Sequence, residues 1–99
     1  MSYDVLLRRA AERDIADALR WYEDQEPGLG SLLHGELDHT LRHLAEHPLI
    51  YPAVYRGIRR AIVSRFPLLV WFQVMDNQVL VLACTHGRMG PRQVAAHLR

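Results

Sequence analysis

The sequence contains no lysine, a single cysteine and no long hydrophobic run. The lone Cys84 has no partner for an internal disulfide, and its place within an apolar segment predicts a small buried hydrophobic residue. No apolar run approaches the roughly 20 residues that a helix needs to cross a bilayer. The first nine residues place no basic segment ahead of an apolar one, which argues against a signal peptide. We therefore expect a cytoplasmic protein that does not act in a membrane.

Several sequence motifs that are typical of catalytic or cofactor-binding sites are also missing. The chain has no glycine-rich phosphate loop, no zinc pattern and no nucleophile elbow, so we expect no cofactor and no metal. With 99 residues, 49% of them hydrophobic and 23% charged, the composition predicts one folded domain over residues 1–99.

All twelve strongly basic residues are arginine, and their distribution is uneven. The absence of lysine fits either a preference for phosphate and carboxylate ligands or the codon usage of a GC-rich genome. Residues 1–50 hold ten acids and five arginines, a balance of −5, whereas residues 51–99 hold one acid and seven arginines, a balance of +6. This asymmetry indicates either a basic face that meets an acidic partner or two halves that attract each other within the fold.

Hydrophobic periodicity predicts two helices between one early strand and three late strands. The predicted elements are a strand over 3–8, helices over 10–26 and 31–46, and strands over 58–64, 68–75 and 78–86. Ser31 is the expected N-cap of the second helix, residues 49–55 are expected to form a loop, and the segment after Pro91 a short tail. This order predicts an α+β fold, β-α-α-β-β-β, with a helical hairpin packed on a mainly antiparallel four-stranded sheet.

The last two strands are apolar on both faces, which a sheet with one wet face would not show. In residues 68–75, Leu68, Val70, Phe72 and Val74 share one face, and Leu69, Trp71, Gln73 and Met75 share the other. In residues 78–86, the same alternation groups Val79, Val81, Ala83 and Thr85 against Leu80, Leu82, Cys84 and His86. One hairpin covers one face. The other face needs either the C-terminal tail and a curled sheet, or a partner chain or second copy.

Arginines near the three late strands are candidates for partner binding. These are Arg56, Arg59, Arg60, Arg65, Arg88 and Arg92. We expect them to line one groove that suits phosphate or an acidic, apolar peptide. The alternative is a set of separate solvated arginines whose stems lie along the surface.

Histidines provide two further candidate sites. His86 with Arg88 suits metal-independent RNA cleavage, since one side chain moves protons and the other stabilises developing charge, but no third group is evident. The alternative is that His86 is a structural histidine at the end of a strand. His39, His43 and His47 repeat every four residues, a spacing that suits either a metal or, without further ligands, a solvated helix edge. Trp21 lies off the apolar stripe of the helix predicted over 10–26. We therefore expect it either to pack at the edge of the helical hairpin or to form part of an interface.

Several short stretches of this sequence, in their order and spacing along the chain, resemble the ParE branch of the RelE/ParE toxin superfamily. They are Asp14-Ile15-Ala16-Asp17-Ala18, Trp21-Tyr22-Glu23, Pro27-Gly28-Leu29-Gly30, Glu36-Leu37, Tyr51-Pro52, Arg59-Arg60-Ala61, Arg65-Phe66-Pro67 and His86-Gly87-Arg88 followed by Pro91. The resemblance implies a type II toxin that binds DNA gyrase and is neutralised by an antitoxin wrapping its sheet. It allows a homo-oligomer or a heterotetramer with the antitoxin.

The alternative within the same superfamily is a RelE-like, ribosome-dependent mRNA endonuclease. The resemblance would then make Arg65, His86 and Arg88 the catalytic candidates. RelE-type nucleases carry an arginine early in the third strand, where this chain has Leu68 or Leu69, so binding without chemistry is favoured. The candidate partner-binding residues are Trp21, Arg59, Arg60, Arg65, Trp71, His86, Arg88 and Arg92. A decayed toxin kept as an interaction module is a third hypothesis.

Overall fold

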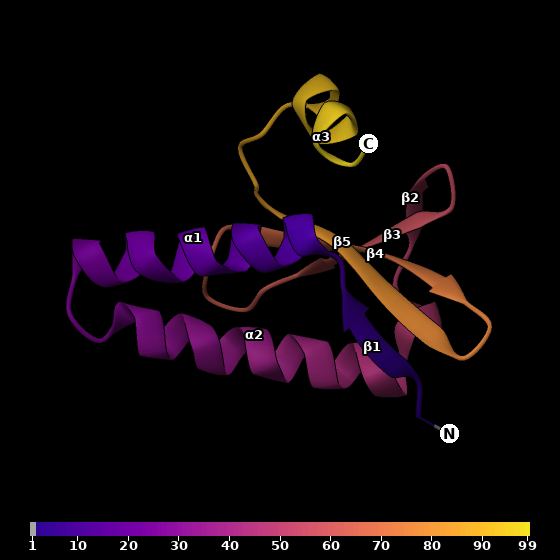
Figure 1. Cartoon of the computed structure of the whole chain (residues 1–99), viewed down its shortest axis with the longest axis horizontal. Coiled ribbons are helices and arrows are strands. Elements are labelled where there is room, and N and C mark those ends of the chain that lie inside the picture. Colours follow the sequence, from indigo (N-terminus) through magenta and orange to yellow (C-terminus); the bar gives the residue numbers. More distant parts are fainter. Residues whose placement is uncertain (1) are drawn as a thin grey trace.

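The computed structural model describes residues 2–99, so Met1 of the predicted domain lies outside the described residues. The elements in chain order are β1 (Asp4–Leu7), α1 (Arg9–Gln25), α2 (Leu29–Glu46), the 3-10 turn η1 (Pro48–Ile50), β2 (Ala53–Tyr55), β3 (Ile58–Ile62), β4 (Leu68–Met75), β5 (Gln78–His86) and α3 (Pro91–His97). The predicted α+β class and the helical hairpin on a sheet are confirmed (Figure 1). No helix among the described residues combines the length and the hydrophobicity that crossing a bilayer requires.

The sheet has five strands in the order β1-β5-β4-β3-β2, one more than predicted. β3, β4 and β5 form the expected antiparallel meander, and β1 lies parallel to β5. The additional strand, β2, falls in the segment that was predicted to be a loop. Its three residues are all exposed, and so short a segment shows no burial pattern from which a strand could be predicted.

The two long helices run side by side and cover one face of the sheet. Their predicted apolar stripes are confirmed, because every member packs in the same core cluster. The stripe of α1 is Ala11, Ile15, Ala18, Leu19 and Tyr22, and that of α2 is Leu33, Leu37, Leu41 and Leu44. Phe72 and Val70 of β4 are fully buried beneath these helices, so this hairpin-side face is closed by the chain itself.

The start of α2 differs from the prediction, since Gly28 and not Ser31 is the N-cap residue. Gly28 has φ of 96°, a left-handed conformation that glycine adopts without a steric penalty. The side chain of Glu23, on the last turns of α1, accepts hydrogen bonds from the backbone N–H of Gly28 at 3.1 Å and of Gly30 at 2.9 Å. A carboxylate from the preceding helix therefore satisfies free backbone donors at the start of α2.

A β-bulge in β5 changes the predicted faces of that strand. Trp71 pairs with Ala83 and Phe72 pairs with Val81, so Leu82 is an extra residue opposite β4. Strict alternation would have put Ala83 and Thr85 with Val79 and Val81. Instead, Ala83 packs in the cluster on the opposite face, and Cys84 packs in the hairpin-side core. A single inserted residue reverses the side-chain alternation of everything after it.

The second face of the sheet is partly covered by α3, the helix formed by the predicted C-terminal tail. Val94 and Leu98 are buried against a cluster of sheet residues on this side, which comprises Ile58, Trp71, Leu82 and Ala83. Figure 1 shows α3 set apart from the two long helices, at the end of the connector that follows β5. Of the two predicted covers, the tail is thus present, and it is much smaller than the hairpin.

Candidate partner-binding groove

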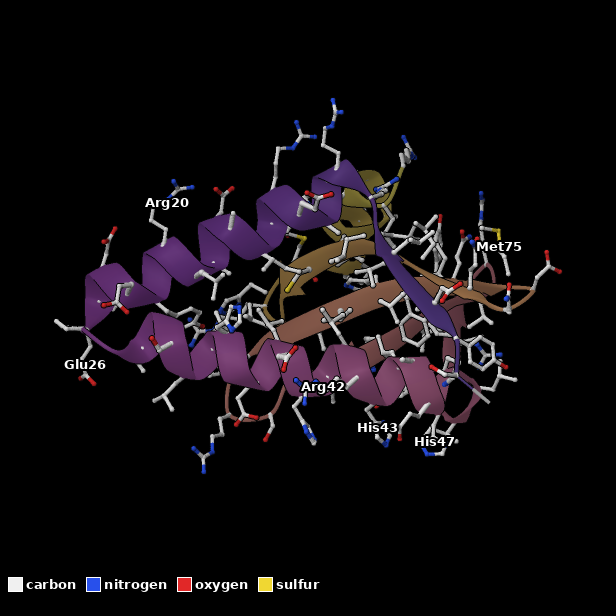
Figure 2. All side chains as sticks on the ribbon, turned by 60° about the horizontal axis from the view of Figure 1, so that its bottom comes forward. Arg20, Glu26, Arg42, His43, His47 and Met75 are labelled. Atoms are coloured by element: carbon white, nitrogen blue, oxygen red, sulfur yellow. The ribbon has the colours of Figure 1, made fainter. Side chains whose placement is uncertain are left out.

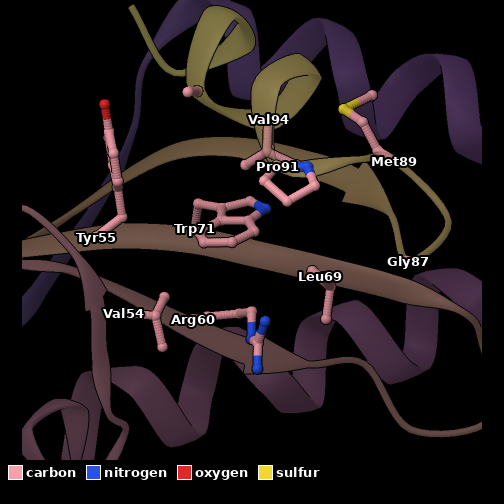
Figure 3. A pocket seen from close by; sticks show the side chains of 10 residues that line it. Val54, Tyr55, Arg60, Leu69, Trp71, Gly87, Met89, Pro91 and Val94 are labelled. Carbon is pink, nitrogen blue, oxygen red and sulfur yellow. The ribbon is translucent and has the colours of Figure 1, made fainter.

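A groove of about 260 Å³ lies between α3, β4 and β2 on the second face of the sheet (Figure 3). Trp71 lies at its centre, with Val94 and Pro91 on the α3 side and Arg60 and Leu69 on the sheet side. The complete lining is Val54, Tyr55, Arg60, Leu69, Trp71, Gly87, Met89, Pro91, Val94 and Ala95.

Trp71 makes a hydrogen bond and a cation–π contact in this groove. Its Nε1–H donates to Oγ1 of Thr85 at 2.8 Å, a contact that exists because the bulge turns Thr85 to this face. The guanidinium carbon of Arg60 lies 5.8 Å from the centroid of the indole ring, within the range of a cation–π interaction. Trp71 is itself buried, so the groove contains a covered aromatic ring with a positive charge near it.

The groove has the chemistry of a binding site. Among the described residues that line the groove, Arg60 is the sole one with a formal charge at neutral pH, and none is a carboxylate or a histidine. General acid–base catalysis needs a group that takes or gives a proton near neutral pH, and the lining provides none. An apolar side chain next to an acidic group fits these walls.

Exposed apolar residues continue from the groove across the neighbouring strands. Val54 and Tyr55 on the edge strand β2 are 43% and 37% exposed, and Ile62 at the end of β3 is 70% exposed. Leu49 and Ile50 in η1 are also exposed, at 57% and 69%. The surface around β2 thus combines large exposed apolar side chains with an unpaired strand edge.

Two of the predicted partner-binding residues, Arg60 and Trp71, line the groove together. Arg88 and Arg92 are exposed and belong to the segment that supplies Gly87, Met89 and Pro91 to the lining. Neither Arg88 nor Arg92 has an ion-pair partner among the described residues. Their predicted roles in partner binding stay predictions.

Arg59 and Arg65 lie elsewhere, so the expectation that all the arginines share one groove is wrong. The guanidinium of Arg59 donates to the backbone carbonyl of Tyr51, in the connection that precedes β2. The Nε of Arg65 lies 3.5 Å from a carboxylate oxygen of Glu36 on α2. Side chains on β3 alternate, so Arg59 faces the hairpin and Arg60 faces α3.

His86 also points away from the groove lining. Its Nδ1 accepts a hydrogen bond from the backbone N–H of Arg88 at 3.1 Å, which tightens the turn after β5. Thr85 bonds to Trp71 on the α3 side, so alternation places His86 on the opposite face. The nuclease candidates Arg65, His86 and Arg88 therefore do not converge on the groove.

Trp21 and the histidines of α2 lie on the hairpin. Trp21 is 57% exposed and packs edge-to-face on Tyr22, with ring centroids 4.9 Å apart. His43 Nδ1 and the Tyr51 hydroxyl share a hydrogen bond of 2.6 Å, and burial raises the pKa of Tyr51. Figure 2 shows His43 and His47 at the outer side of the last turns of α2. His43 thus has a hydrogen-bonding role, and the described residues contain no cluster of three metal-binding side chains.

Sequence reasoning missed most of the groove walls. Val54, Tyr55, Met89 and Pro91 come from segments assigned to loops and turns, which carry no periodic signal. The spacing of Val94 and Leu98, one helical turn apart, was the one available sign that the tail folds onto the sheet.

A family model described as "ParE toxin of type II toxin-antitoxin system, parDE" matches residues 5–91 of this chain. A comparison with curated protein sequences finds no match.

The fold is similar to chains in several solved structures of toxins and toxin–antitoxin systems. One, from the chromosomal ParDE toxin–antitoxin system of P. aeruginosa, is 16% identical with a TM-score of 0.76, covering 86% of this chain and 96% of that one. A chain of the RelBE2 toxin–antitoxin complex of Mycobacterium tuberculosis is 18% identical with a TM-score of 0.62, covering 87% and 92%. A mutant of the E. coli toxin RelE in the free state is 19% identical with a TM-score of 0.66, covering 89% and 86%.

Proposed function

Because the chain belongs to the ParE toxin family of type II toxin–antitoxin systems, we propose that it arrests growth in the cytoplasm by binding DNA gyrase. The supporting observation is the lining of the α3-side groove, where Arg60 lies beside the buried ring of Trp71 and no acid–base pair is present among the described lining residues. In the nuclease branch, the resemblance places an arginine where Leu68 or Leu69 stands here. Leu69 lines the groove and has no charge to stabilise a transition state.

The experiment is induced expression of the chain with two parallel readouts. We expect growth arrest accompanied by loss of DNA supercoiling, and inhibition of purified gyrase by the purified chain. Transcripts from the same cells should stay intact. Ribosome-dependent cleavage of transcripts without any effect on gyrase would replace this proposal by the endonuclease alternative.

A matched pair of arginine variants tests whether the groove contacts the target. Arg60→Gln removes the charge at the edge of Trp71 and should raise the concentration needed for gyrase inhibition roughly tenfold, the cost typical of an interface arginine. Arg42→Gln is the control, because Arg42 lies on the outer surface of α2 with its side chain 78% exposed and pairs with Asp38. Equal inhibition by both variants would remove the groove from the proposed mechanism.

We also propose that a cognate antitoxin neutralises this chain by covering the exposed apolar surface around β2. Its segment should be acidic and apolar, since the surface presents Ile62 and Val54 beside Arg60. Co-expression with the adjacent small open reading frame should convert a poorly soluble or self-associated chain into a defined complex. Size-exclusion chromatography with light scattering distinguishes a homo-oligomer from a heterotetramer.

A further inference from the structure

The short helix α3 is held to the body of the protein by polar contacts at its last residue, His97. The Nε2 of His97 lies 2.8 Å and 3.0 Å from the two carboxylate oxygens of Asp14 on α1. A guanidinium nitrogen of Arg8 donates to the backbone carbonyl of His97 at 3.3 Å. Both partners precede or belong to the first turns of α1, far from α3 in sequence.

The same two residues also anchor to the sheet, so they form a fixed platform. The Nε of Arg8 donates to the carbonyl of Leu82 at 2.7 Å, and Asp14 accepts a hydrogen bond from the backbone N–H of Cys84 at 2.9 Å. β1 pairs with β5 only as far as Val81, so these side chains satisfy the β5 edge that β1 leaves open. The side chain of Asp14 is 15% exposed, whereas that of His97 is 36% exposed.

The apolar attachment of α3 is small by comparison. The helix has seven residues, too few to be stable without tertiary contacts, and it buries Val94 and Leu98. The groove of about 260 Å³ lies beneath it, so packing between α3 and the sheet is incomplete. Gly87 and Gly90 lie in the connector that joins α3 to β5.

From this arrangement we infer that α3 is a hinged lid over Trp71, held closed by Asp14 acting through His97. Asp14 is a positioning residue, because it touches the lid and the sheet but does not line the groove. With the contact broken, α3 swings about its connector and Trp71 becomes accessible while the five-stranded core stays folded. The consequence for toxicity, that the lid limits partner access to Trp71, rests on the proposed function.

Fluorescence tests the lid directly. The chain has two tryptophans, so Trp21→Phe leaves Trp71 as the single reporter. In that background, His97→Ala and Asp14→Ala should each at least double the acrylamide quenching constant of Trp71. His97→Gln keeps a side-chain donor for Asp14 and should restore much of the protection. His39→Ala, an exposed histidine of α2, should leave quenching unchanged.

Denaturant unfolding of the variants distinguishes a lid that opens by itself from a contact on which the whole fold depends. We expect the denaturant midpoint of His97→Ala to stay close to that of its parent while quenching rises. Unchanged quenching in both His97→Ala and Asp14→Ala overturns the proposal. Cooperative unfolding of the whole domain in His97→Ala also overturns it, because α3 would then be part of one folding unit.

Growth and gyrase assays use the native sequence, in which Trp21 is intact, so that the two proposals can be tested separately. If quenching rises in His97→Ala but the native chain neither arrests growth nor inhibits gyrase, the lid stands and the proposed function fails. If the native chain inhibits gyrase and quenching is unchanged, the function stands and the lid fails.

Discussion

The hairpin-side face of the sheet lies under two helices of 17 and 18 residues, whereas the opposite face has only the seven-residue α3 for cover. Both faces carry the same kind of side chain, large and apolar. The hairpin side buries Phe72 and Leu33 completely, while the α3 side leaves a groove beside Trp71 and exposes Ile62. Similar strand sequences thus yield a closed core on one side and a surface available for binding on the other.

The difference shows that, in this small chain, one face of the sheet provides most of the stability and the other face is available for binding. A continuous core on one side gives the fold its stability, so the other side tolerates incomplete packing. On the α3 side the guanidinium of Arg60 lies within cation–π range of Trp71, and no such contact is found among the described residues of the hairpin-side cluster.

The largest expected effect is a contrast between identical substitutions on the two faces. Leu33→Ala, at a fully buried position beneath the hairpin, should lower the free energy of unfolding by about 3–5 kcal/mol. Leu98→Ala, at the buried residue that caps α3, should cost about 2 kcal/mol or less, because a short helix at the edge relaxes into the space. Chemical denaturation of both variants measures the contrast, and equal costs would mean that the two faces are equally well packed.

Chemical labelling of Cys84 reports on the closed face. Burial, with the negative charge of Asp14, raises the pKa of this thiol from 9.0 to about 12. At pH 8 the reactive thiolate should therefore be on the order of 10²- to 10³-fold scarcer in the folded than in the unfolded chain. Iodoacetamide labelling with and without denaturant measures the ratio, and rapid labelling of the folded protein would contradict the closed core.

The same raised pKa predicts an alkaline limit to stability. The folded state holds the Cys84 proton more tightly than the unfolded state does, so folding binds protons above about pH 9. This contribution is fully present below pH 9 and is lost as the pH rises toward 12. Denaturation midpoints of the native chain should fall more steeply over this range than those of Cys84→Ala.

Alanine substitutions at two glycines of the helical hairpin should change the stability by smaller amounts and in opposite directions. Gly28→Ala places a Cβ on a residue with φ of +96° and should cost about 1–2 kcal/mol. Gly35→Ala lies within α2 with open space around the added Cβ, and should stabilise the protein by roughly 0.5–1 kcal/mol. Thermal unfolding of the pair separates the backbone effect from any effect of added volume.

The smallest expected effect on stability belongs to the α3 side. Ile62→Asp, at a position 70% exposed, should change the free energy of unfolding by no more than about 0.5 kcal/mol. The same substitution should weaken antitoxin binding, because it places an acidic group on the surface proposed to receive an acidic segment. Titration of both proteins by calorimetry tests this, and unaltered affinity would remove Ile62 from the interface.

The local patterns in the sequence were sufficient for the main elements. The apolar stripes of both long helices, the meander and the two-faced strands all follow from side-chain periodicity, which depends on neighbours in the chain. β2 was missed because its three exposed residues have no such pattern. The cap of α2 was wrongly assigned to Ser31, because no local pattern shows that the carboxylate of Glu23, on the preceding helix, accepts from the backbone N–H of Gly28.

Several features of the candidate groove could not be predicted from the sequence. Periodicity identified Trp71 as a residue on a second apolar face, but the bulge at Leu82 decides that Thr85 turns to that face and accepts its indole N–H. The contact of Asp14 with His97, across most of the chain, depends on how distant segments meet. The order of residues thus determined which surfaces are apolar, because burial of side chains follows a local repeat. Only the tertiary structure decided which of those surfaces stays open, because that depends on how much chain remains to cover it.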